Sequence, residues 1–452
     1  MDTKLQQNPL TDGPLTKSLL WFTVPFLLSN LLQTLYGTVD TLVVGNFGST
    51  AGVSAVATGA QTLSLVTFFT MGLSAGSTVL VGQYVGARDG KKAAEVVGNT
   101  IIDFTVLSLF MTAAMLLTYP LILTALNVPA EAMQEARKYM IICSCGIPLI
   151  VGYNTVCALL RAIGDSKSPL LFVGIACFVN IFGDLLLTGA LHMGAAGVAI
   201  ATVTAQGVSF IFSLIFIMKK GLSFPFSRHD IRFHRSVTGR IAKIGIPMGV
   251  QSILINLSFL FITSIINAMG LTASAAMGIG DKIIGFAFMP QSAFSSSVAV
   301  VVAQNIGAGK RDRAMRTVKV SILLCLVIEL VFFAACQLFP NFFPALFSND
   351  NEVIRMAGLY MRAYSFDAVL TAITFSYSGY LNGRGLTTFN MTQNLIATFL
   401  GRVPATWLLS KLPDTNLFLI GLASPFSTLI SIILLLLYVR HVHRNDRLSG
   451  QI

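Results

Sequence analysis

Two aspartates lie inside long apolar stretches of the chain, Asp40 in residues 17–44 and Asp184 in residues 168–190. Asn180 precedes Asp184 by four positions and shares its helix face, and Thr202 lies in the next apolar stretch. An ionised carboxylate is costly in apolar surroundings, and two together cannot both ionise cheaply. Such a group of oxygens can bind a proton or a dehydrated Na⁺. The alternative is that Asp184 only completes a polar network between helices.

Other polar side chains in apolar stretches are candidates for a substrate cavity. They are Asp367, Gln206, Asp281, Lys282 and Glu329. Asp281 and Lys282 are adjacent, so they point in different directions on a helix, and either can line a cavity or pair with Glu329 or Arg402. Asp103 lies near one end of its apolar stretch, where we expect water to solvate it.

The apolar stretches contain none of the residue patterns that enzymes, metal centres or ATP-driven pumps require. The five histidines fall in loops or the tail, and the six cysteines have no metal-ligand spacing, so we expect them to be small buried hydrophobes. No Gly-x-x-x-x-Gly-Lys-Ser/Thr phosphate loop occurs. We therefore predict no enzymatic activity and no cofactor, with an ion gradient as the energy source.

Composition assigns the chain to the membrane class. Of its 452 residues 54% are hydrophobic and 11% charged, with a mean hydropathy of +0.76. Soluble domains carry about a quarter charged residues, so the surface must face lipid. The net charge of +11 would suggest nucleic acid for a soluble protein. In a membrane protein we expect this positive charge to lie in the loops, so no nucleic-acid partner is expected.

Hydropathy predicts twelve transmembrane helices, and hence an all-α integral membrane fold. The predicted spans are 17–44, 53–84, 94–118, 137–160, 168–190, 195–218, 241–269, 272–303, 316–339, 355–380, 386–410 and 416–439.

Basic residues gather at alternate connections, which sets the topology by the positive-inside rule. They include Lys4, Lys17, Arg88, Lys91, Lys92, Arg161, Lys167, Lys310, Arg311, Arg313, Arg384 and Arg447, with seven more in residues 219–243. The other loops hold only Arg137, Lys138, Arg355 and Lys411. We predict a multi-pass protein of the plasma membrane with both termini cytoplasmic.

The chain repeats itself at an offset of 221 positions, give or take one. The repeat aligns Gly82-Gln-Tyr-Val-Gly86 with Ala303-Gln-Asn-Ile-Gly307, and Pro25 with Pro247. An even number of spans separates the copies, so the two six-helix lobes are parallel, related by a pseudo-two-fold axis, and would form a cavity between them. We predict an N-lobe at 1–218, a basic cytoplasmic linker at 219–240 and a C-lobe at 241–452. Because a single chain supplies both lobes, we expect the protein to be a monomer.

The sequence resembles the multidrug and toxic compound extrusion (MATE) family, within the multidrug/oligosaccharidyl-lipid/polysaccharide exporter superfamily, over essentially its whole length. The residues that carry the resemblance are Pro25 with Asp40, the segment 81–87, Arg161-Ala-Ile-Gly-Asp165, and Asn180-Ile-Phe-Gly-Asp184 followed by Gly194-Ala-Ala-Gly197.

The resemblance implies that Asp40, Asn180, Asp184 and Thr202 form the N-lobe cation site, open to H⁺ or Na⁺. The segment around Asp367 resembles one in which an acidic residue contributes to cation or substrate binding. The glutamate that accompanies it in that branch is missing here, since the segment reads Gln251-Ser-Ile-Leu-Ile-Asn256. That absence favours the substrate cavity for Asp367. Pro25 can bend the first helix and move Asp40, or it can be a static kink.

These residues predict a secondary active multidrug exporter that exchanges amphipathic organic cations for H⁺ or Na⁺ by alternating access. The alternative is a lipid-linked saccharide flippase of the same superfamily. That activity requires a strongly cationic cavity, and basic residues within the spans are few.

Overall fold

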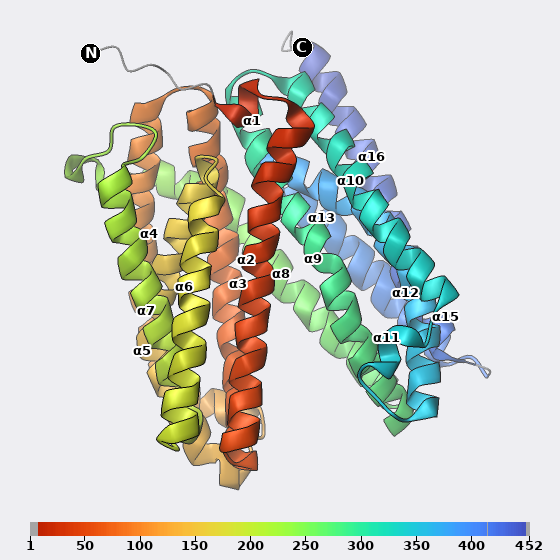
Figure 1. Ribbon diagram of the computed structural model, residues 1–452. Coiled ribbons are helices and arrows are strands. Elements are labelled where there is room, and N and C mark those ends of the chain that lie inside the picture. Colours follow the sequence, from red (N-terminus) through yellow and green to blue (C-terminus); the bar gives the residue numbers. More distant parts are fainter. Residues whose placement is uncertain (1–7, 414, 449–452) are drawn as a thin grey trace. The chain divides into compact units, whose positions relative to one another are not determined.

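The computed structural model describes residues 8–413 and 415–448, and these residues form helices and short connections without any strand (Figure 1). Contacts within the chain define two units, one of Trp21–Gly249 and one of the described parts of Met1–Leu20 and Val250–Ile452. The predicted all-α class is therefore confirmed. The lobe boundaries at 218 and 241 stay a prediction.

The unit Trp21–Gly249 is a bundle of long helices. Its elements are most of α2 (Leu15–Phe47), α3 (Thr50–Gly86), α4 (Gly90–Ala125), α5 (Ala130–Ala162), α6 (Lys167–Asp184), the π-helix η1 (Leu185–Ala190), α7 (Gly194–Lys220), the 3₁₀-helix η2 (Arg228–Asp230) and the first part of α8 (Arg235–Asn267).

The second unit is also a helical bundle, and three of its elements are short. It comprises α1 (Pro9–Asp12), the remainder of α8, α9 (Leu271–Gly307), α10 (Arg311–Leu338), α11 (Phe342–Ala345), α12 (Asn351–Gly383), α13 (Thr387–Leu395), the π-helix η3 (Ile396–Arg402), α14 (Val403–Ser410), α15 (Leu417–Gly421) and α16 (Ala423–Leu448).

Ten helices in the described part of the chain are long and apolar enough to cross a membrane. α12 and the run α13–η3–α14 supply the other two predicted spans, so the twelve-helix fold is confirmed. The predicted ends were wrong by several residues: the span predicted at 94–118 is the helix Gly90–Ala125. Hydropathy marks only the lipid-facing stretch, whereas caps such as Asp89, which accepts from Lys92 N, start the helix further out.

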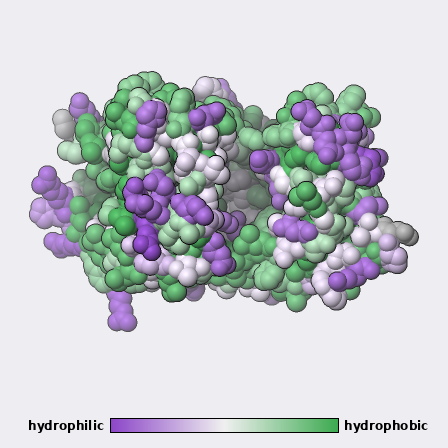
Figure 2. All heavy atoms as spheres, turned by 90° about the horizontal axis from the view of Figure 1, so that it is seen from below, coloured by the Kyte–Doolittle hydropathy of each residue, from purple (hydrophilic) through white to green (hydrophobic). Residues whose placement is uncertain are grey.

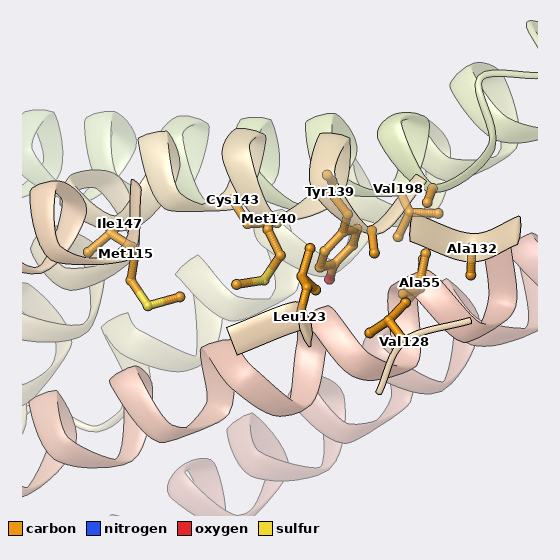
Figure 3. Close-up of a cluster of buried hydrophobic side chains, with 14 of the residues drawn as sticks. Ala55, Met115, Leu123, Val128, Ala132, Tyr139, Met140, Cys143, Ile147 and Val198 are labelled. Atoms are coloured by element: carbon orange, nitrogen blue, oxygen red, sulfur yellow. The ribbon is translucent and has the colours of Figure 1, made fainter. Parts of the chain in front are cut away.

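Apolar side chains cover the sides of the bundles, and hydrophilic residues gather on the end face (Figure 2). Inside the first unit, a buried cluster joins α3, α4, α5 and α7 around Tyr139, Met140 and Cys143 (Figure 3). Five of the six cysteines are buried as predicted, but Cys145 is exposed. A short apolar side chain in a spanning helix is as compatible with a lipid-facing surface as with the core.

Glycines let α3 and α8 pack closely in the first unit. A Cβ on Gly72 would lie 2.3 Å from the Gly249 nitrogen, and one on Gly76 would lie 2.5 Å from the Ile241 oxygen. Gly72 and Gly76 are four residues apart, so both lie on the helix face that contacts α8, as is typical of close helix packing in membranes. We expect Gly72→Leu to cost about 1–3 kcal/mol by forcing the helices apart. Thermal unfolding in detergent tests this, with Gly37→Leu, which has open space around it, as the matched control.

Asp103 on α4 is not simply solvated, contrary to the sequence-based expectation. Its carboxylate accepts a hydrogen bond of 2.7 Å from Asn99 Nδ2 and bonds of 2.9 and 3.1 Å from Thr238 Oγ1. Thr238 lies far along the chain, at the start of α8, so no local pattern around Asp103 indicates this partner. Asp103 joins α4 to α8.

Asp165 joins the ends of three helices. Its carboxylate accepts from Ser168 N at 3.0 Å at the start of α6, and from Lys220 Nζ at 2.8 Å at the end of α7. Burial raises the pKa of Asp165, but the hydrogen bonds from Lys220 and Ser168 outweigh burial, so the pKa lies below its ordinary value of 3.8. The aspartate therefore stabilises the fold at and above that pH.

Because the folded pKa is lowered, this contribution disappears as the pH falls through it. Asp165→Asn keeps an acceptor for Ser168 and removes the charge. We expect wild type to unfold at a higher temperature than Asp165→Asn near pH 6, and the difference to shrink as the pH falls toward 3. A difference that did not change with pH would show that the ion pair with Lys220 adds nothing.

The first described residues pack within the second unit, beside the connection between α9 and α10. Asn8 Nδ2 donates to Gln304 Oε1 at 3.0 Å, and Lys310 pairs with Asp12. Asp446 near the end of α16 pairs with Arg311 and Arg384. The two ends of the described chain therefore meet the same end of this unit. Lys4, used in predicting topology, lies outside the described residues, as does the side chain of Arg447.

Candidate ion-binding site

Three helices of the first unit bring the predicted cation-site residues together. Asp40 lies on α2, Asn180 and Asp184 on α6, and Thr202 on α7. α6 gives way to the π-helix η1 at Leu185, the residue after Asp184. Such insertions of wider turns are frequent at functional sites.

Weak hydrogen bonds link the four side chains. Thr202 Oγ1 donates to Asp40 Oδ2 at 3.4 Å, and Asn180 Nδ2 donates to Thr202 Oγ1 at 3.4 Å. The carboxyl groups of Asp40 and Asp184 lie next to one another. The side chains are buried, Asp40 being 9% exposed, Asn180 1% and Asp184 0%.

Several oxygens of this cluster have no hydrogen-bond donor among residues 8–413 and 415–448. They are Asp40 Oδ1, Asn180 Oδ1 and both carboxylate oxygens of Asp184. A buried acceptor without a donor is costly unless a proton or a cation satisfies it. Carboxylate, amide and hydroxyl oxygens suit a hard cation such as Na⁺, so the donor set fits Na⁺ as well as H⁺.

Gln206 and Tyr36 extend the cluster by one turn. Gln206 lies on α7, four residues after Thr202, and its Nε2 donates to the Tyr36 hydroxyl at 3.3 Å. Tyr36 precedes Asp40 by four residues on α2. The sequence analysis did not single out Tyr36, although its spacing from Asp40 placed it on the same helix face. Gln206 is thus a neighbour of the predicted cation site.

Pro25 lies within α2, which continues through it from Leu15 to Phe47. Its carbonyl accepts from Ser29 Oγ at 2.9 Å. Whether the helix bends here during transport stays a prediction.

Asp367 in the second unit is buried and its carboxylate is fully used. Located on α12 and 3% exposed, it accepts from Ser424 Oγ at 2.9 Å and from Thr428 Oγ1 at 2.5 Å, both on α16. The two hydroxyls come from a helix distant in sequence, so the sequence analysis did not find them.

Arg402, at the end of η3, supplies a half-buried positive charge to the same region. Its guanidinium lies 4.2 Å from the centre of the Phe259 ring, and its Nη2 donates to the Tyr364 hydroxyl at 3.2 Å. Asp281 and Asp367 both interact with this charge electrostatically. Of the pairings left open for Asp281, the structure brings it near Arg402.

Lys282 and Glu329 lie in different environments. Lys282 on α9 is exposed, whereas Asp281 beside it is half-buried. Glu329 on α10 is 1% exposed, and neither of its carboxylate oxygens has a hydrogen-bond donor in the described chain. No ion pair joins Lys282 and Glu329 among the described residues. Their assignment to a substrate cavity stays a prediction.

The internal repeat relates the two polar clusters. The offset that superposes Pro25 on Pro247 also superposes Thr202 on Ser424 and Gln206 on Thr428. It superposes Asn180 on Arg402. The second unit therefore carries a guanidinium where the first unit carries an amide. This offset was the signal that could have identified Ser424 and Thr428.

The apolar spans and the buried polar clusters define a multi-pass membrane transporter. The MatE family model matches the chain twice, over residues 25–186 and 247–408. The matches begin at Pro25 and Pro247, the two residues that the internal repeat aligns. The chain belongs to the MatE family of transporters, and it is not an enzyme.

Relatives of known name cover nearly the whole chain. The probable multidrug resistance protein YpnP of Bacillus subtilis is 28% identical, over 88% of this chain and 89% of its own length. The probable multidrug resistance protein NorM of Thermotoga maritima is 24% identical, over 87% of this chain and 86% of its own length. The bent form of the Vibrio cholerae MATE transporter VcmN shares the fold, with a TM-score of 0.88 at 18% identity, covering 96% and 98% of the two chains.

Proposed function

We propose that this protein is a multidrug exporter that exchanges small amphipathic organic cations for H⁺ or Na⁺ by alternating access. The observation that carries the proposal is the buried cluster of Asp40, Asn180, Asp184 and Thr202, with acceptor oxygens that lack donors. The names of the relatives YpnP and NorM, both probable multidrug resistance proteins, support the drug class.

The cluster suits ion-coupled transport because its net charge depends on whether a proton or Na⁺ is bound. With the site empty, two adjacent carboxylates repel one another and lack donors. A proton or Na⁺ relieves that repulsion and draws α2, α6 and α7 together. A cation that binds one arrangement of these helices more tightly shifts the protein toward it, and this differential affinity is the source of energy for export.

A lipid-linked saccharide flippase is the alternative, and the charges argue against it. Recognition of a pyrophosphate needs free cationic side chains. Arg402 is already engaged by Phe259 and Tyr364, and Arg362 Nε donates to Gln337 Oε1 at 3.3 Å. Buried carboxylates, by contrast, occur in both units.

We further propose that the protein resides in the plasma membrane as a monomer, with both termini cytoplasmic. Its partners are then the organic cation substrates and the bilayer, without a nucleic-acid partner or a bound cofactor. The basic residues at the connections on one side support this orientation.

Transport by the purified protein in liposomes tests the proposal. We expect an imposed H⁺ or Na⁺ gradient, varied independently, to drive ethidium movement, and only one of the two gradients to be required. Movement of a fluorescent lipid-linked pyrophosphate sugar, with no ethidium movement under either gradient, would favour the flippase instead.

A further inference from the structure

A large apolar cavity opens on the outer surface of the first unit, away from the proposed cation site. Its volume is about 780 Å³, and its walls are α4, α5 and α7 with the linker after α7 (Figure 1). This volume lies within the roughly 300–1,000 Å³ typical of small-molecule sites. The contributing parts of the three helices are the halves nearest the linker, at one membrane surface.

The cavity has a buried floor and an exposed rim. Phe104 and Thr155 in the floor are 4% and 5% exposed, while Leu109 and Met218 at the rim are 58% and 81% exposed. Exposed apolar side chains on a spanning helix suit contact with lipid, so we expect these two to face the bilayer. The cavity therefore opens toward the hydrocarbon of the bilayer.

The hydroxyl groups of the wall already donate within the protein. Thr105, Ser108 and Thr155 donate to backbone oxygens of their own helices at 2.7–2.8 Å. Ser227 Oγ donates to Asp230 Oδ2 at 3.0 Å. The helical part of the wall therefore suits a hydrocarbon chain, which needs no hydrogen-bond partner.

The linker that closes the cavity is fixed in place and adds one charge. A Cβ on Gly98 would lie 1.9 Å from the Asp230 oxygen, and His234 N donates to Asn99 Oδ1, so the linker lies directly on α4. Among the described residues that line the cavity, Arg228, exposed at the start of η2, is the only charged one. It stands where the apolar wall ends.

We propose that this cavity binds a membrane phospholipid, with an acyl chain along α4, α5 and α7 and an anionic headgroup at Arg228. An apolar wall that ends at a single cation matches the order of groups in such a lipid. A bound chain would fill the space between the three helices and fix their packing. The site is separate from the proposed cation site, and it does not depend on the proposed function.

Native mass spectrometry of the detergent-solubilised full chain tests this, with phosphatidylglycerol and phosphatidylcholine of identical acyl chains as probes. One basic residue near an anionic headgroup favours binding about fivefold. We expect wild type to prefer phosphatidylglycerol by that factor, and Arg228→Gln to abolish the preference. Arg232→Gln, an exposed change in the same linker outside the cavity, should retain it.

Two substitutions test the acyl-chain position. Thr155→Phe fills the floor, and Leu109→Trp narrows the rim without touching the buried wall. We expect either to reduce binding of both lipids at least as much as Arg228→Gln reduces that of phosphatidylglycerol. Thr118→Phe, on the exposed far half of α4, should bind as wild type.

The proposal fails if both cavity variants fold and retain wild-type lipid binding. It also fails if Arg228→Gln keeps the anionic preference. Competitive displacement of the lipid by ethidium, with the cavity variants raising the KM for ethidium transport, would instead identify a substrate site. Loss of lipid binding with unchanged ethidium transport would support the lipid site alone.

Discussion

Asp40→Asn and Asp184→Asn are each expected to abolish gradient-driven ethidium efflux. Asparagine matches aspartate in size, so helix packing is kept, but it cannot bind a proton or supply a negative charge to Na⁺. A coupling free energy between two ligands typically corresponds to a factor of roughly 5–150, and efflux should fall by at least the lower value. The measurement is efflux from energised cells, with pH and Na⁺ varied independently.

A matched control separates coupling from folding. Asp103→Asn also removes a carboxylate from a spanning helix of the same unit, but Asp103 already has donors from Asn99 and Thr238. We expect Asp103→Asn to retain efflux that follows the same ion. Normal gradient-driven efflux in both cluster variants would remove Asp40 and Asp184 from the coupling mechanism.

The spans could be predicted from the sequence because lipid imposes a length and a composition on each one. The depth of the ion-binding cluster in the membrane could also be predicted. Asp184 lies about 24 Å from the start of its helix, which brings it to the same depth as Asp40 and Thr202. Helix ends were less predictable, because capping residues such as Asp89 lie outside the apolar pattern.

Contacts between helices distant in sequence were beyond prediction from local patterns. Asp103 was expected in water because it lies near a helix end, yet Thr238 on α8 reaches it. The π-helix after Asp184 has no signature in the apolar periodicity. Only the internal repeat links distant positions: applied to Thr202 and Gln206, its offset would have pointed to Ser424 and Thr428.

The repeat suggests how the two polar clusters differ in function. The first unit has two carboxylates and an amide, and several of its acceptors lack donors. In the second, the Asp367 carboxylate is satisfied by Ser424 and Thr428, and Arg402 supplies a fixed positive charge nearby. A permanent guanidinium occupies the role that a mobile cation is proposed to play in the first unit.

Arg402→Met is therefore expected to destabilise the second unit. It keeps an apolar chain against Phe259 but leaves Asp281 and Asp367 without a counter-charge. Removing one partner of a fully buried ion pair costs about 3–5 kcal/mol, and the loss should be smaller here because Arg402 is half-buried and no ion pair joins it to either carboxylate among the described residues.

Adding Asp367→Asn to Arg402→Met should restore most of that loss, because it removes the more deeply buried of the two uncompensated charges. Thiol labelling during heating, read at Cys325 and Cys336 by peptide mass spectrometry, measures unfolding of this unit, since both are 0% exposed. Exposed Cys145 is first replaced by serine. If Arg402→Met unfolds at the wild-type temperature, the guanidinium does not compensate the two carboxylates. If only the double variant is unstable, Asp367 acts through its hydroxyl partners Ser424 and Thr428 and not through Arg402.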